Sequence, residues 1–161
     1  MMSEATENTE PFQVVVKPES FQRSARGQIT GEIWVSVGGD VFPGPRWSDL
    51  VVAVLHGWLY EALEFSRDGP DTIRLHFMDG PFAIDVERQD STRCQVTFLE
   101  RPNKEAIVAS YVSARQVMTA LVATACIVLE ECEVRGWTSR DVVELKMMSQ
   151  RLANLRSREW S

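Results

Sequence analysis

Alternating hydrophobic and polar residues mark the first part of the chain as β-structure. Between Gln28 and Val37, apolar residues occupy every second position and mostly polar residues lie between them. Because successive side chains of a strand point to opposite faces, this period of two predicts a strand with one buried face. The run from Phe12 to Lys17 predicts an earlier strand, which Pro18 closes. Glycines and prolines at 38–40 and 43–45 then predict turns.

A period of three to four residues replaces this alternation between about Ser48 and Phe65. Apolar residues at that spacing predict a helix with a wide buried stripe, formed by Val51, Val54, Leu55, Trp58, Leu59, Ala62 and Leu63. Ser48 or Asp49 is the expected cap, because either side chain accepts a hydrogen bond from a backbone N–H that the first turn leaves unpaired.

Alternation returns in three short segments joined by tight turns, which predict an antiparallel meander. The inward residues are Ile73, Leu75 and Phe77, then Phe82, Ile84 and Val86, then Cys94, Val96 and Phe98. Lys104 to Val112 is expected to add a fourth strand. One face of such a sheet is solvated, and it is expected to carry Arg74, His76, Asp85, Glu87, Arg93, Gln95 and Thr97.

Two further helices are predicted after the meander. Ser113 and Gln116 form a capping box for the first, whose segment 119–129 is apolar on most sides and is therefore expected to lie deep. Gly136 is suited to end it. Thr138 and Asp141 are expected to cap the last helix. The predicted fold class is α+β: a two-layer arrangement in which an antiparallel meander sheet of about six strands is backed by three helices, the last two forming a helical hairpin.

The length of 161 residues fits one domain, given roughly 100–200 residues per domain. We expect a disordered N-terminal tail over residues 1–10 and a single α+β domain over residues 11–161. Three cysteines, Cys94, Cys126 and Cys132, form no CxxC pair, which favours a reducing compartment. The start of the chain lacks the basic and apolar regions of a signal peptide, and no apolar run is long enough to span a bilayer. These features predict a cytoplasmic protein.

The formal net charge of −6 changes the range of expected partners. It argues against binding of nucleic acid or an anionic membrane, because their affinity comes largely from Lys and Arg contacts to phosphates. It is compatible with a basic protein partner, which an acidic surface would attract.

Few residues predict catalysis or metal binding. His56 lies within the strongly apolar first helix and is interpreted as a histidine that packs beside it. His76 lies on the solvated face of the meander, where an imidazole could serve as a general base, but no serine or cysteine motif offers it a nucleophile. Cys126 and Cys132 lie about 240° apart around a helix and cannot readily share an ion. No cofactor and no metal site is predicted.

The candidate partner-binding residues are acidic, with one aromatic exception. Glu130, Glu131 and Glu133 crowd a helix C-terminus, where the helix dipole disfavours negative charge, so they form either an ordinary solvated face or an acidic patch for a basic partner. Trp34 points with Glu32 away from the apolar side of its strand. It is either an exposed interface anchor or a residue covered by the Pro43–Trp47 loop or a neighbouring strand.

Two stretches of the sequence resemble small bacterial immunity proteins of polymorphic or contact-dependent toxin systems. They are IWVSVGGDVFPGPRWSDLVVAVLHGWL at residues 33–59 and FMDGPFAIDV at residues 77–86. The likeness lies in the Phe-Pro loop, the Trp-x-Asp helix start and the MDGP turn, and it covers about a third of the chain. The resemblance implies a non-enzymatic inhibitor that binds a cognate toxin domain, and it transfers no functional residue.

The sequence therefore predicts a protein-binding domain that neutralises a basic toxin domain by occluding it. The predicted binding residues are Trp34, Glu32, Asp85, Glu87, Glu130, Glu131 and Glu133. The alternatives are an enzyme or small-ligand-binding protein with His76 near its site, and a homo-oligomeric structural protein. A homodimer is compatible with each of these functions.

Overall fold

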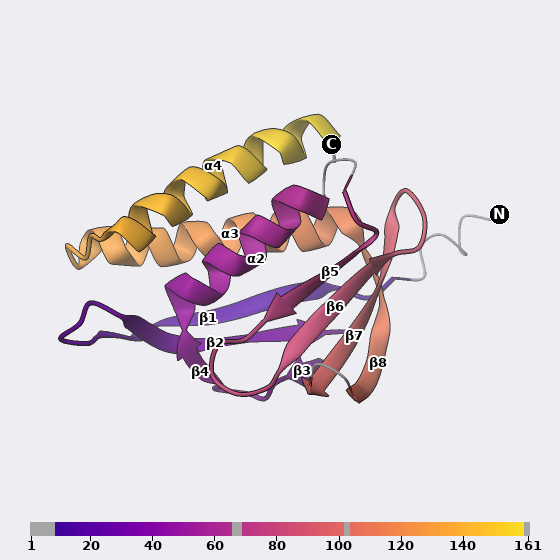
Figure 1. Cartoon of the computed structure of the whole chain (residues 1–161), viewed down its shortest axis with the longest axis horizontal. Coiled ribbons are helices and arrows are strands. Elements are labelled where there is room, and N and C mark those ends of the chain that lie inside the picture. Colours follow the sequence, from indigo (N-terminus) through magenta and orange to yellow (C-terminus); the bar gives the residue numbers. More distant parts are fainter. Residues whose placement is uncertain (1–8, 66–68, 102–103, 160–161) are drawn as a thin grey trace.

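The computed structural model describes residues 9–65, 69–101 and 104–159, and the side chains among them except those of residues 101–109 and 156–159. This part of the chain forms an α+β fold with eight strands and three helices. The helices lie together on one side of the strands (Figure 1). The predicted tail over residues 1–10 falls mostly outside the described residues, but the backbone N–H of Glu10 donates to the Tyr111 carbonyl at 2.8 Å.

The first sheet contains β1 (Phe12–Arg23), β2 (Ile29–Val37), β3 (Asp40–Phe42) and β4 (Ser48–Leu50). Its strands are antiparallel, in the order β1-β2-β3, and β4 pairs with the other end of β2. The predicted strand at 28–37 is thus confirmed. The prediction that Pro18 closes the first strand is wrong, because β1 continues through an irregularity between Lys17 and Gln22. There the Ser20 hydroxyl donates to the Lys17 carbonyl and accepts from the Glu32 N–H, which replaces part of the ladder.

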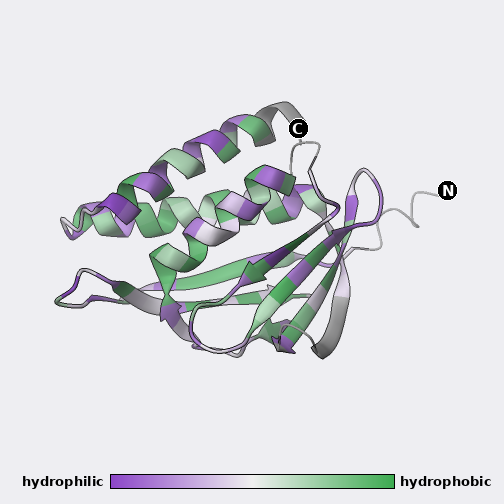
Figure 2. Cartoon of the chain, in the orientation of Figure 1, coloured by the Kyte–Doolittle hydropathy of each residue, from purple (hydrophilic) through white to green (hydrophobic). Residues whose placement is uncertain are grey.

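The second sheet is the predicted meander, with β5 (Thr72–His76), β6 (Ala83–Arg88), β7 (Arg93–Arg101) and β8 (Lys104–Ser113) in sequence order. Hydrophobic and hydrophilic residues alternate along β6 and β7 (Figure 2). The side chains that were predicted to point inward from the three segments, from Ile73 to Phe98, are buried, except that Phe82 is half-buried.

The expectation of one sheet with about six strands is wrong in its organisation. Two four-stranded sheets form because β3 and β4 pair with β2 within segments that were predicted as a turn and a helix start. The sheets meet through aromatic side chains: the rings of Phe42 on β3 and Phe98 on β7 stack at 4.6 Å and 5°. Phe77 and Phe82 contact Phe42 edge to face.

The helices are α2 (Val51–Phe65), α3 (Ala114–Val134) and α4 (Arg140–Glu159). The predicted stripe of α2 is buried, and the indole N–H of Trp58 donates to the His76 carbonyl at 2.7 Å. The Ser113 cap is confirmed, and Gly136 has the positive φ of 70° expected after a helix. For α4, however, the cap is Ser139, whose hydroxyl accepts from the Val142 N–H at 3.3 Å.

Asp49 does not cap α2, which begins at Val51. Its side chain is 3% exposed, and its Oδ2 accepts hydrogen bonds from the Trp47 indole N–H and from the backbone N–H groups of Met78 and Asp79, at 3.1–3.2 Å. Oδ1 accepts from the Leu50 N–H at 2.7 Å. A buried carboxylate needs such partners. Through these hydrogen bonds Asp49 joins the start of α2 to the β5–β6 turn.

No helix in the described part of the chain is long and apolar enough to cross a membrane.

Candidate functional site

The outer face of the second sheet carries Asp85 and Glu87. The charge of Asp85 is largely neutralised by an arginine on the neighbouring strand. Arg74 lies opposite Asp85 in the β5–β6 register, and its guanidinium donates to both carboxylate oxygens at 2.7 and 3.0 Å. That hydrogen bond raises the pKa of Arg74 above its ordinary value. Glu87 is exposed two residues further along β6. Among the side chains that the structure describes, this face therefore presents mixed charge around Asp85 and Glu87.

Trp34 and Glu32 lie on β2 in the other sheet. Trp34 is only 9% exposed, which contradicts the expectation of an exposed anchor and agrees with the alternative that the ring is covered. Glu32 is half-buried, with its carboxylate 3.9 Å from the Arg46 guanidinium. The structure thus separates Trp34 and Glu32 from Asp85 and Glu87, because the two pairs belong to different sheets.

The C-terminal half of α3 carries the other three predicted residues. Glu131 is bonded to Arg135 at 2.7 Å, and Arg135 also donates to the Phe21 and Pro18 carbonyls. Glu130 and Glu133 are exposed and make no ion pair with a described residue. Apolar side chains accompany them: Ile127 is 43% exposed and Val134 is 82% exposed. We refer to Ile127, Glu130, Glu133 and Val134 as the α3 strip.

The sequence predicted the two glutamates of the α3 strip but not its two apolar residues. Segment 119–129 was expected to lie deep because it is apolar on most sides, and Leu121, Ala125 and Val128 are indeed buried. Ala123, Cys126 and Ile127 are nevertheless exposed. Spacings of three and four residues place Ile127, Glu130 and Val134 on one face, and this helical register is the signal that would have shown the strip.

The two histidines line one pocket of about 210 Å³ between α2 and β5. Tyr60, Glu61, Arg74 and Met78 also line it. The imidazole Nε2 of His56 lies 3.5 Å from the Glu144 carboxylate on α4, and His76 is exposed. Sequence patterns do not place these histidines together, because twenty residues and a change of element separate them.

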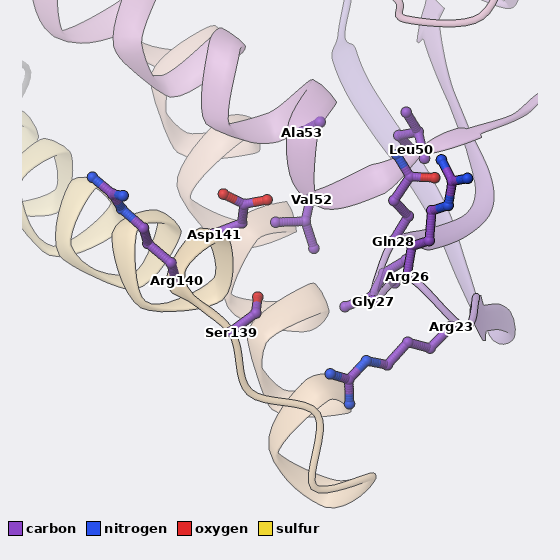
Figure 3. Close-up of a pocket in the computed structure, with 11 residues that line it drawn as sticks. Arg23, Arg26, Gly27, Gln28, Leu50, Val52, Ala53, Ser139, Arg140 and Asp141 are labelled. Atoms are coloured by element: carbon purple, nitrogen blue, oxygen red, sulfur yellow. The ribbon is translucent and has the colours of Figure 1, made fainter.

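A second pocket, of about 320 Å³, lies between the β1–β2 hairpin and the start of α4. Three arginines line it, but they do not converge. Arg140 points away from the hairpin, and Arg23 and Arg26 extend in different directions (Figure 3). Arg140 is also paired with Glu144 at 3.1 Å. The arrangement lacks the convergent donors that hold an anion.

A groove with a larger volume, about 500 Å³, lies between β1 and α3. Its β1 wall is formed by residues 11–16, and its α3 wall by Gln116, Thr119, Ala120, Ala123, Thr124 and Ile127. None of these residues is charged. We call this feature the edge groove, since β1 is the edge strand of its sheet. No pattern in the sequence indicated this groove, because strand order cannot be read from alternation.

Metal-ligating and thiol groups add no site in the described part of the chain. No group of three or more His, Cys, Asp or Glu side chains there has the arrangement to hold a metal ion. Cys94 and Cys132 are buried and Cys126 is exposed. Burial raises the pKa of Cys94 to about 11 and also raises that of Cys132, which makes both thiols poor nucleophiles at neutral pH.

Comparisons of the chain with protein-family models, with curated proteins and with solved structures found no match.

Proposed function

We propose that this chain is a non-enzymatic protein-binding domain of the bacterial immunity type, which neutralises a basic toxin domain by occluding it. The observation that carries the proposal is the α3 strip. Two exposed apolar side chains and two carboxylates without a described ion-pair partner lie together on one helix.

The electrostatics of the α3 strip favour a cationic partner. Glu130 and Glu133 lie in the last two turns of α3, where the helix C-terminus carries partial negative charge and each carboxylate costs about 0.3–1 kcal/mol. Arg135 offsets this cost at Glu131. Lysine or arginine side chains of a partner would offset it at Glu130 and Glu133, and they would also accelerate association.

The apolar members of the strip supply the part of the interface that salt does not weaken. Val134 has most of its surface in water, and burying such a side chain against a partner is favourable by about 1.5–3 kcal/mol. An apolar centre with a charged rim is the common composition of protein interfaces.

Affinity capture from a native lysate tests this function. The bait is the tagged chain, and the comparison baits are the Glu130→Lys/Glu133→Lys variant and a matched Glu61→Lys/Glu64→Lys variant on α2. A stoichiometric basic protein captured by the first and third baits, and lost from the second, supports the proposal. Equal capture by all three baits contradicts it.

A small-ligand function is the second candidate, and the shared histidine pocket favours it. Imidazole, phenol, carboxylate and thioether groups line a space of about 210 Å³, which can hold only part of a drug-sized molecule. Ligand-detected NMR with a fragment library tests this function. Binding that is lost in His76→Ala but kept in His56→Ala would support the role predicted for His76, whereas no binding would exclude this pocket.

A further inference from the structure

The outer edge of β1 has backbone groups that the fold leaves open. In the β1–β2 ladder, the Gly38 N–H donates to the Pro11 carbonyl, so Pro11, and with it Gln13 and Val15, face β2. Antiparallel ladders alternate, and the N–H and C=O groups of Phe12, Val14 and Val16 therefore point away from β2. The Phe12 N–H confirms this direction, because it donates to Gln116 Oε1 on α3 at 3.1 Å.

Val14 and Val16 have no backbone partner on this edge among the described residues. Their side chains are half-buried and pack against the core beside α3. An open strand edge with an uncharged groove beside it is a template for another strand.

We propose that the edge groove is the interface of a homodimer, in which β1 pairs antiparallel with β1 of a second copy and Val14 lies on the two-fold axis. In this register Val14 exchanges both of its backbone hydrogen bonds with its own copy. The Val16 N–H of each chain donates to the Phe12 carbonyl of the other. The Phe12 N–H already donates to Gln116, so it is not available to the second copy, and the pairing ends there.

The edge groove is a surface where charge does not oppose a second copy as the occupant. Two chains that each carry a net charge of −6 repel, and this repulsion is smallest at a contact where both surfaces are uncharged. The residues that line the edge groove meet this requirement. They are also self-complementary, because the open backbone groups on either side of Val14 satisfy each other under a two-fold rotation.

The packing of α3 is compatible with this arrangement. The two-fold axis stands perpendicular to the joined sheet, so both copies of α3 lie on the same face and run antiparallel. Thr119, Ala120 and Ala123 line the edge groove, and such small side chains allow the two helices to approach. Ile127 belongs to both the α3 strip and the edge groove, whereas Glu130, Glu133 and Val134 do not line the groove. Charge reversal at Glu130 and Glu133 therefore tests the proposed partner-binding function without altering a residue of the proposed dimer contact.

Sedimentation velocity on the intact chain, over a wide concentration range, tests the dimer. The expected species has twice the chain mass of 18.2 kDa. Val14→Pro removes an outward N–H and obstructs strand addition without removing a β1–β2 hydrogen bond, so we expect it to sediment as a monomer. Thr72→Pro is the matched control, because Thr72 occupies the equivalent outward position on β5, the edge strand of the other sheet. We expect it to remain dimeric.

A cross-link tests the register directly, and it does not depend on the folding of a proline variant. In a Cys126→Ser background, Val14→Cys is expected to form an intermolecular disulfide on mild oxidation, because Cα atoms in a hydrogen-bonded antiparallel pair lie about 5.5 Å apart. Val15→Cys is expected to cross-link much less, since Val15 would face Gln13 of the second copy. A monomeric wild-type chain, or equal cross-linking at both positions, would overturn the proposal.

Discussion

The Asp49 carboxylate accepts a hydrogen bond from the Met78 N–H at 3.1 Å, and this contact joins two segments that lie 29 residues apart. Asp49 belongs to the Trp-x-Asp sequence, and Met78 begins the MDGP turn. The stretches at residues 33–59 and 77–86 thus meet at this contact. Their common role is to hold the start of α2 against the β5–β6 turn.

Replacing Asp49 by alanine should destabilise the fold. Asp49→Ala leaves the Met78 and Asp79 N–H groups and the Trp47 indole without their acceptor, at about 1–3 kcal/mol for each donor that water cannot reach. We expect a total loss of about 2–4 kcal/mol in the free energy of unfolding, measured by urea denaturation. Asp40→Ala, at an exposed carboxylate, should change it by less than about 0.5 kcal/mol. Similar values for the two variants would show that the Asp49 contacts contribute little.

The same substitution should have opposite effects at Gly31 and Gly57. A Cβ on Gly31 would collide with the Phe21 ring, which is 1% exposed, so Gly31→Ala should cost about 1–3 kcal/mol. A Cβ on Gly57 meets no atom within 4 Å, and alanine is the better helix former by about 1 kcal/mol. Gly57→Ala should therefore raise the melting temperature and Gly31→Ala should lower it. A stabilising Gly31→Ala would contradict the packing of Phe21 on β2.

Stability should decline at alkaline pH partly through Cys94. Burial raises the pKa of this thiol from 9.0 to about 11, so between these values the unfolded chain loses a proton that the folded chain keeps. The folded state is therefore favoured below pH 9 and loses this advantage as pH rises to 11, by roughly 2–3 kcal/mol. Urea denaturation of wild type and Cys94→Ala across this range checks it. The decline should be shallower in the variant, and parallel curves would refute the assignment.

The thiols should also differ in their reaction with an aromatic disulfide reagent at pH 8. Cys126 is exposed, whereas Cys94 and Cys132 are buried with raised pKa values. One thiol per chain should react rapidly in the native protein, and Cys126→Ser should abolish that phase. Rapid reaction of a second thiol would show that the core around Cys94 or Cys132 opens readily.

Local patterns in the sequence predicted most elements of the fold but not how they assemble. Alternation identified β2 and the meander because each has one buried face, and three- to four-residue spacing identified the stripe of α2. The division into two sheets depends on the three-residue strands β3 and β4, which are too short to show a period. The continuation of β1 past Pro18 depends on a side-chain bond from Ser20, which no hydrophobic pattern indicates.

The candidate sites were predictable only where the signal was local. The clustering of Glu130, Glu131 and Glu133 was visible because these residues are close in sequence. The pairing of Asp85 with Arg74 arises from neighbouring strands, and register cannot be read from one strand alone. Prediction of the edge groove would require knowledge of the strand order, because the groove forms only where β1 lies at the edge of its sheet beside α3.

The most direct test of the proposed function is the affinity of a captured basic partner for the wild-type chain and for Glu130→Lys/Glu133→Lys, measured by calorimetry at two salt concentrations. Both reversals would place like charges against the partner, so we expect affinity to fall by at least about tenfold, or 1.4 kcal/mol. We also expect the salt dependence to weaken, while Glu61→Lys/Glu64→Lys binds as wild type does. Unchanged affinity in Glu130→Lys/Glu133→Lys would contradict the assignment of the α3 strip as the binding surface.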